Sequence, residues 1–166
     1  MGRVGLVGRV GLVGRVGLVG RVSGRVSGAE WHPPWLIKEV NVPLNHHSLI
    51  AWQRADDLFI KLHQLSLKAF PAHEQFELGT QLRRSAYSVA ANIVEGFARR
   101  HGRDRLHFLN IAESSLAEVG YCIHVALRLG YITDVVAKDL EREVRTVGGP
   151  LVGLIRSTRA AVVPPT

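Results

Sequence analysis

Two rows of polar residues have types and spacings that could do chemistry, and both lie on segments expected to be helical. In each row the polar residues recur at three- and four-residue steps, which places them on one stripe of a helix. Together the rows offer carboxylates, an imidazole, a guanidinium, amides, hydroxyls and a phenol. The first row is Gln81, Arg84, Ser88, Asn92 and Glu95, and the second is His107, Asn110, Ser114, Glu118 and Tyr121.

Folding the chain back on itself about residue 101 places the two rows opposite each other. Glu95 then faces His107, and Arg84 faces Glu118, a carboxylate that can accept two hydrogen bonds from a guanidinium. The other levels pair an amide with an amide, a hydroxyl with a hydroxyl, and a glutamine with a tyrosine. The two rows therefore predict a hydrogen-bonded polar seam between two antiparallel helices, in which Arg84 and Glu118 are coupled.

This seam has a catalytic interpretation and a structural one. In the catalytic interpretation, Glu95 and His107 act as the acid and base of a hydrolase. In the structural interpretation, the seam sets the register of the two helices or belongs to a subunit interface. Hydroxyl and amide pairs outnumber ionisable pairs, and no nucleophile has a base and an orienting group beside it. These observations favour the structural interpretation, and we expect no catalytic residues and no enzymatic activity.

The elements that position these rows are predicted to be four amphipathic helices. Apolar residues recur with helical spacing along four segments separated by proline or glycine. Short connections make consecutive helices antiparallel, so the fold class is all-α, an up-down-up-down antiparallel four-helix bundle. The helices are expected from Ser48, a possible N-cap, to Pro71; through residues 81–96; from about Asp104 to Leu129; and after a cap at Thr133 or Asp134.

Two further positions predict local geometry. Gly130 follows the third apolar segment and is expected to be the C′ glycine that ends that helix. Pro150 lies inside the fourth segment, where a proline removes a hydrogen bond and clashes with the preceding turn. We therefore expect a kink or break near Gly149.

Low-complexity sequence precedes the predicted bundle. Residues 2–19 repeat Gly-Arg-Val-Gly-Leu-Val, and the first 28 residues contain five arginines and no acidic residue. Glycine at this density opposes helix and strand alike, so residues 1–45 are expected to be a disordered arm and linker. The arm is either a basic segment that contacts phosphates or low-complexity sequence translated from upstream of the natural start, and the second interpretation is favoured. Residues 46–159 form the expected bundle, and residues 160–166 a frayed tail.

Composition limits the classes of function. The net charge of +7 falls to +2 for residues 29–166, which contain 16 basic and 14 acidic residues. Cys122 is the only cysteine, which excludes an intramolecular disulfide and is typical of a cytoplasmic protein. The N-terminal arginines interrupt every apolar stretch, so no membrane insertion is expected. The chain has no Glu-x-x-His motif and no phosphate-binding loop, and we expect no metal and no cofactor.

Arginines are expected to gather at one end of the bundle. Antiparallel topology brings the connection between the second and third helices close to the start of the first helix and the end of the fourth. The expected phosphate contacts are Arg99, Arg100, Arg103 and Arg105, with Arg54, Arg156 and Arg159 nearby. A second choice, at the opposite end, is Arg83, Arg84 and Arg128.

Several of these segments resemble a known family. The segments are Leu49-Ile-Ala-Trp-Gln-Arg-Ala55, Phe70-Pro71, the run that ends in Asn92-Ile-Val-Glu-Gly96, His107-Phe-Leu109, Ser114-Ser-Leu-Ala-Glu118 and Leu129-Gly-Tyr-Ile132. In order and spacing, over about residues 46–159, they resemble the four-helix-bundle proteins encoded in intervening sequences of bacterial 23S rRNA genes.

The resemblance implies a small bacterial cytoplasmic protein that forms a homopentamer and has no accepted enzymatic activity. It also implies a natural start near Val40, and a more distant similarity to basic, nucleic-acid-binding accessory proteins of diversity-generating retroelements. Together with the arginines, it leads us to expect a non-enzymatic oligomer that binds RNA or DNA or scaffolds a nucleoprotein complex. The alternative is a purely structural protein-interaction ring that uses the outward faces of the first and fourth helices.

Overall fold

Four long helices account for most of the chain that the structure describes. The computed structural model describes residues 45–162, which begin with a short 3-10 helix, η1 (Asn45–Ser48). The main elements are α1 (Ile50–Ala69), α2 (Leu78–Ala98), α3 (Gly102–Arg128) and α4 (Asp134–Val162). No strand occurs within residues 45–162, so the predicted all-α class is confirmed. The prediction of a disordered arm and linker concerns residues 1–45, of which residues 1–44 lie outside this range and Asn45 begins η1.

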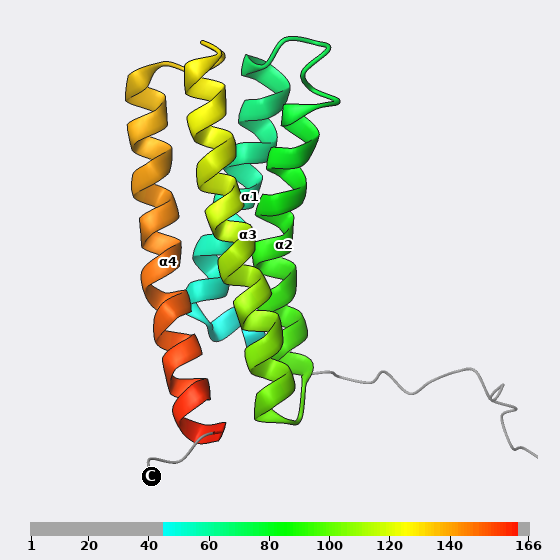
Figure 1. The fold of residues 1–166 in the computed structure, drawn as a ribbon, viewed down its shortest axis with the longest axis vertical. Helices are drawn as coiled ribbons and strands as arrows, with labels where there is room; N and C mark the ends of the chain where they lie inside the picture. Colours follow the sequence, from blue (N-terminus) through cyan, green and yellow to red (C-terminus); the bar gives the residue numbers. More distant parts are fainter. Residues whose placement is uncertain (1–44, 163–166) are drawn as a thin grey trace, which may run out of the picture. The chain divides into compact units, whose positions relative to one another are not determined.

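The four helices pack as an up-down-up-down bundle, as the sequence predicts (Figure 1). α1 packs against α2 and α4, and α3 packs against the same two helices. Within the described residues, the diagonal pairs α1 with α3 and α2 with α4 make no close backbone approach. Each helix therefore contributes one apolar face to a shared core and leaves its outer face to solvent.

The core is built from aliphatic side chains of all four helices. Leu62, Ile93, Leu109 and Leu151 are completely excluded from solvent, and full burial of one such side chain contributes about 1.5–3 kcal/mol. Two residues of the connections are buried in the same core: Phe70, in the connection before α2, and Ile132, in the connection before α4. The connections are thus anchored to the helices that they join.

The ends of the helices follow local chemistry, with some differences from the sequence-based expectation. Gly130 has a φ of 75°, and the N–H groups of Gly130 and Tyr131 donate to the carbonyls of Leu127 and Ala126, which closes α3 in a Schellman motif. Thr133 caps α4, because its Oγ1 accepts from the N–H of Val136 at 3.4 Å. The prediction of Ser48 as the N-cap of the first helix is wrong: Leu49 occupies that position, after the turn of η1.

Two boundaries of the bundle also differ from the prediction. α3 begins at Gly102, two residues before the expected start at Asp104, and α4 extends to Val162. Residues 160–162, which were expected in the frayed tail, are therefore helical. The remaining residues of that tail, 163–166, lie outside the described range. A contact accounts for the extension of α4, because Val162 packs directly against the backbone of Gly102.

α4 continues through Pro150, so of the two alternatives predicted near Gly149, a kink or a break, the break is wrong. A proline at this position cannot donate to the carbonyl four residues earlier, which belongs to Thr146. Nη1 of Arg54, on the neighbouring α1, donates to that same carbonyl at 2.8 Å. The side chain of another helix thus replaces the lost backbone hydrogen bond, which removes much of the reason for the helix to end.

Candidate nucleic-acid interface

The polar seam between α2 and α3 forms only in part, and with different partners from those predicted. The Oγ atoms of Ser88 and Ser115 lie 2.8 Å apart, so Ser115 takes the place expected for Ser114. Glu118 accepts a hydrogen bond from the amide of Gln81. Asn92 donates to the carbonyl and hydroxyl of Ser88 on its own helix. Within the described residues, no ion pair joins Arg84 to Glu118.

The difference comes from the rotation of α3 about its axis. The face of α3 that meets α2 belongs to the core and contains small residues, among them Ala112, Ser115 and Cys122. α2 packs against the buried face of α3. Polar residues on the opposite face of α3 therefore cannot contact α2. His107, Asn110, Ser114 and Tyr121 are accordingly exposed, and the predicted pairing of the whole rows is wrong.

Glu95 and His107, the proposed acid and base, have other partners. Glu95 pairs with Arg99 one turn along α2, and His107 makes an edge contact with the ring of Phe108, with ring centroids 5.5 Å apart. Within the described residues, no hydrogen bond connects Glu95 to His107. The geometry therefore provides neither an oriented base nor a shared proton.

Two of the four arginines predicted to contact phosphates at the α2–α3 connection are engaged in the fold. Arg105 donates from Nη2 to the carbonyl of Arg99, the residue that ends α2, at 3.2 Å, and its guanidinium lies 5.1 Å from the ring centre of Phe97. Arg99 pairs with Glu95, and its guanidinium lies 4.7 Å from the ring centre of Phe108. Arg105 thus closes α2, while the half-exposed Arg99 retains only part of its hydrogen-bonding capacity.

The other predicted arginines, at the opposite end, separate into structural and exposed residues. Arg83 donates to Ser66 Oγ at 3.0 Å, to the carbonyl of Gln75 at 2.7 Å and to Thr80 Oγ1 at 3.2 Å. Its guanidinium fastens the α1–α2 connection to both helices and is not available to a ligand. Arg84 is exposed and forms no ion pair within the described residues.

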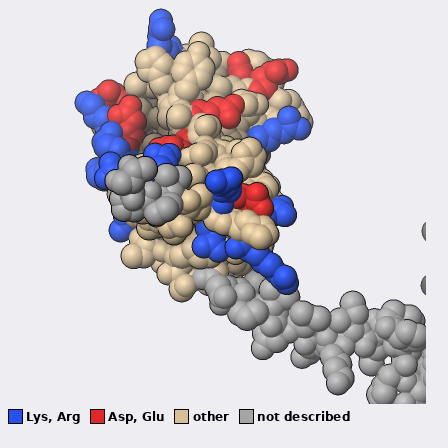
Figure 2. Space-filling model, turned by 60° about the horizontal axis from the view of Figure 1, so that its bottom comes forward, with Lys and Arg blue, Asp and Glu red and all other residues tan. Residues whose placement is uncertain are grey.

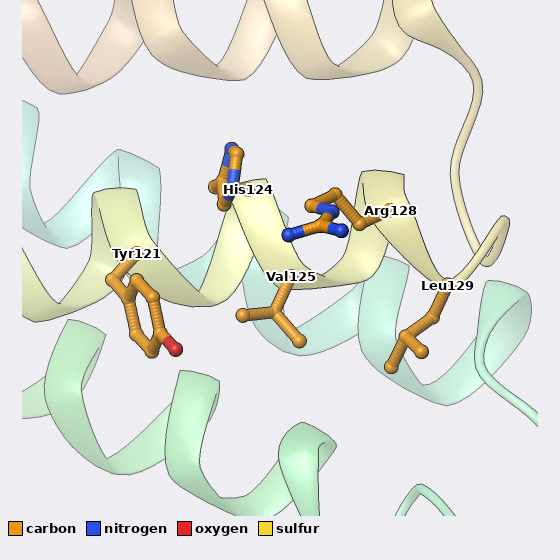
Figure 3. A pocket seen from close by; sticks show the side chains of 5 residues that line it. All are labelled: Tyr121, His124, Val125, Arg128 and Leu129. Carbon is orange, nitrogen blue, oxygen red and sulfur yellow. The ribbon is translucent and has the colours of Figure 1, made fainter.

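Arg128, at the same end, is exposed and lines a shallow hollow of about 260 Å³ with other residues of α3. Figure 3 shows that its five lining side chains project from α3 and from Leu129, the residue that follows it, and spread in different directions. The hollow therefore contains a single arginine and has no opposing wall that supplies another. The lining residues are Tyr121, His124, Val125, Arg128 and Leu129.

The exposed arginines gather where the α2–α3 connection meets the end of α4. The packing of Val162 on Gly102 joins these two elements. Arg100, Arg103, Arg156 and Arg159 are exposed there, and within residues 45–162 none of them forms an ion pair. Residues 95–105 and the last two turns of α4 together contain six arginines and two carboxylates, Glu95 and Asp104. Glu95 is already paired with Arg99. We call the group of Arg100, Arg103, Arg156 and Arg159 the arginine end.

Figure 2 brings this end of the bundle forward. Lys and Arg side chains are frequent on the part of the surface nearest the viewer, whereas several Asp and Glu side chains lie farther up in the view. A surface of this kind attracts phosphate groups without recognising a base sequence. Arg156 and Arg159 could be found from the sequence only by placing the end of the fourth helix beside the α2–α3 connection.

Other kinds of site have less support in the described part of the chain. Within residues 45–162, no group of three or more His, Cys, Asp or Glu side chains is placed to hold a metal ion. No helix in that range combines the length and the apolar character needed to cross a membrane. Cys122 is buried, and its burial, followed by the nearby Glu118 carboxylate, raises the pKa of its thiol, which opposes a nucleophilic role.

Comparison with known proteins agrees with this fold. Residues 47–153 match the pattern of a family described as 23S rRNA-intervening sequence protein. A crystal structure of a protein of unknown function from the S23 ribosomal protein family of Bacteroides thetaiotaomicron VPI-5482 superposes with a TM-score of 0.61 at 21% sequence identity. The superposition covers 64% of this chain and 96% of that protein, and at this identity it shows the shared fold alone. A search of curated proteins found no match.

Proposed function

The chain belongs to the 23S rRNA-intervening sequence protein family, and from this premise we propose that it is a non-enzymatic bundle that binds the phosphate backbone of RNA or DNA. The observation that supports this proposal best is the arginine end, where four exposed arginines have no ion-pair partner within the described residues. Guanidinium groups bind phosphate through two hydrogen bonds at once, and they release condensed counterions as they do so.

The proposed interface recognises charge and spacing, and it does not recognise a base sequence. Phe97 and Phe108 lie at the same end, but the guanidinium groups of Arg105 and Arg99 lie over their rings, so these rings are not open platforms for nucleobases. Contacts to phosphate position a protein on a nucleic acid without reading the bases. We therefore expect similar affinity for different sequences of equal length.

One bundle offers few phosphate contacts, so the proposal includes self-association, which would multiply them. We propose that the chain forms a homo-oligomer in the cytoplasm, a pentamer as the family resemblance implies, and that several arginine ends act together on one nucleic acid. Exposed large apolar side chains such as Ile50, Ile60 and Leu67 support association, since surfaces of this kind are often covered by another chain. Light scattering would determine the assembled mass, and a monomeric mass would remove this part of the proposal.

The direct test measures the affinity of a fluorescently labelled single-stranded RNA of mixed sequence at low salt. The test variant replaces Arg100, Arg103, Arg156 and Arg159 by alanine. We expect its affinity to fall at least about tenfold, because four phosphate contacts are removed together. Circular dichroism and light scattering would verify that fold and assembly are unchanged.

A matched control removes the same number of positive charges elsewhere. Lys68, Lys138, Arg142 and Arg145 are exposed, lie outside the arginine end, and are replaced by alanine in the control. We expect the control to retain most of its affinity. An equal loss in both variants would show attraction by net charge alone, and unchanged affinity in the test variant would favour the protein-interaction ring. If replacing Arg84 and Arg128 by alanine lowered the RNA affinity more than the test variant does, the interface would be assigned to the opposite end.

A further inference from the structure

A second concave site lies between α1 and α2, and it is lined by aromatic and acidic side chains. Its volume is about 370 Å³. α1 contributes Trp52, Asp56 and Phe59, and α2 contributes Tyr87 and Glu95 together with small apolar residues. The lining contains two carboxylates and no lysine or arginine. We call this site the acidic groove.

The aromatic walls of the groove are held in place by neighbouring rings. Phe59 and Tyr87 meet edge to face across the two helices, with ring centroids 5.7 Å apart. The ring of His47 stacks on Trp52 at 4.7 Å, and His46 meets Trp52 at 4.9 Å. The two histidines of η1 thus hold the ring of Trp52 in place, and Tyr87 of α2 holds the ring of Phe59. Tyr87 nevertheless remains 60% exposed, so its ring is available to a ligand.

The floor of the groove is made of small apolar residues. Ala90, Ala91 and Val94 lie on the α2 side, and side chains of this size leave the space between the aromatic walls open. A flexible aliphatic chain fits such a floor, since it contacts apolar atoms along its length. The floor therefore suits the stem of a long side chain better than it suits a flat ring.

The electrostatics of the groove favour a positive charge. Asp56 is half-buried and forms no hydrogen bond or ion pair within the described residues. Among residues 45–162, Glu95 is engaged only by Arg99, one turn along the same helix, in a pair whose side chains are 43% (Arg99) and 46% (Glu95) exposed. Exposed pairs of this spacing are weak, so Glu95 can accept a second donor. Burial, followed by the proximity of His47, lowers the pKa of His46 and so disfavours its charged form.

We propose that the acidic groove binds an arginine side chain of a basic peptide segment in a partner protein. The guanidinium would donate to Asp56 while its plane lies against the aromatic walls, and the arginine stem would cover Ala90 and Ala91. This arrangement combines a charge-assisted hydrogen bond with a cation–π contact at one site. A nucleic acid is disfavoured at this groove, because its phosphates would meet two carboxylates.

The test uses the full chain and a short fluorescein-labelled peptide of glycine and alanine that contains one arginine. A second peptide contains citrulline in place of arginine, which preserves shape and removes the charge. Fluorescence polarisation measures both affinities. We expect the arginine peptide to bind, and the citrulline peptide to bind at least about tenfold more weakly.

Two neighbouring aspartates supply matched variants. Asp56→Asn is expected to weaken binding of the arginine peptide at least about tenfold, whereas Asp57→Asn is expected to leave it unchanged. Asp57 lies next in the chain and carries the same charge, but it lines a different hollow with Arg54 and Lys61. Tyr87→Ala tests the aromatic wall separately, and its exposed position allows the substitution without disturbing the core.

Several results would overturn the proposal. They are no measurable binding of the arginine peptide, equal binding of the citrulline peptide, and equal effects of Asp56→Asn and Asp57→Asn. A change in assembled mass on Asp56→Asn or Tyr87→Ala, measured by light scattering, would assign the groove to a second copy of the chain. Loss of RNA affinity in Asp56→Asn would also contradict it, because nucleic acid is assigned to the arginine end.

Discussion

The two ends of the bundle contain similar charged residues and use them differently. At the end with the α1–α2 and α3–α4 connections, Arg83 donates three hydrogen bonds and Glu74 accepts from the hydroxyl of Tyr131 at 2.9 Å. At the arginine end, Arg100 and Arg103 are exposed and form no ion pair within residues 45–162. Charge at the first end holds the connections together, and charge at the second remains available to a ligand.

The length of the connections explains this difference. Residues 70–77 join α1 to α2 and need side-chain partners for their backbone groups. Gln75 donates to the carbonyl of Phe70, and Arg83 donates to the carbonyl of Gln75. Only three residues, 99–101, join α2 to α3, and Arg105 donates to the carbonyl of Arg99 in this connection. A short connection thus leaves more of its side chains unused by the fold.

The largest expected effect is on stability, at the first end. Replacing Arg83 by alanine should lower the free energy of unfolding by about 2–4 kcal/mol, because three hydrogen bonds to a charged group are lost and Ser66 is completely buried. Arg84→Ala is the matched control, and it should change stability by no more than about 0.5 kcal/mol. Urea denaturation would measure both, and equal losses would show that Arg83 has no special structural role.

A smaller effect should follow from adding a methyl group at a glycine of each end. A Cβ on Gly79 would lie 3.0 Å from the carbonyl oxygen of Glu74, which is backbone and cannot move easily. A Cβ on Gly102 would meet the side chain of Val162, in the last turn of α4. We expect Gly79→Ala to lower the unfolding free energy by about 1–3 kcal/mol and Gly102→Ala to lower it less. The reverse order would show that the backbone of Glu74 yields more easily to the added methyl group than the side chain of Val162 does.

The smallest effect concerns the hydroxyl that links the two connections. Burial, followed by the hydrogen bond to Glu74, raises the pKa of Tyr131 above its ordinary value. The folded state then holds this proton more tightly than the unfolded state, so the contribution to stability is present below pH 10 and is lost as the pH rises through the raised pKa. Tyr131→Phe should cost less than Gly79→Ala and should reduce the fall in stability above pH 10, as thermal unfolding at several pH values would show.

The sequence predicted the fold well, because apolar spacing, glycine and proline act locally. Gly130 and Thr133 adopt the geometry expected of them. Pro150 could not be predicted in the same way, since the donor that satisfies Thr146 is Arg54 on another helix. A local pattern shows that a hydrogen bond is missing, but it does not show which distant side chain replaces it.

The candidate site was harder to predict, because it depends on rotation as well as register. Folding about residue 101 placed Ser88 at the correct level of α3, but a rotation of one residue exchanges Ser114 for Ser115. The same limit applies to the arginines, since Arg99, Arg100, Arg103 and Arg105 are close in sequence and yet differ in what they contact. The acidic groove was missed because Trp52 and Phe59 have the helical spacing of core residues, whereas both are only half-buried.

The most direct test of the difference between the two ends is the salt dependence of RNA binding. The slope of log affinity against log salt concentration reports the number of phosphates neutralised, at about 0.7 per phosphate on a single strand. Removing Arg100, Arg103, Arg156 and Arg159 should reduce the magnitude of this slope by about 2–3, while removing Lys68, Lys138, Arg142 and Arg145 should leave it nearly unchanged. Equal slopes for the unmodified chain and the first variant would contradict the assignment of phosphate binding to the arginine end.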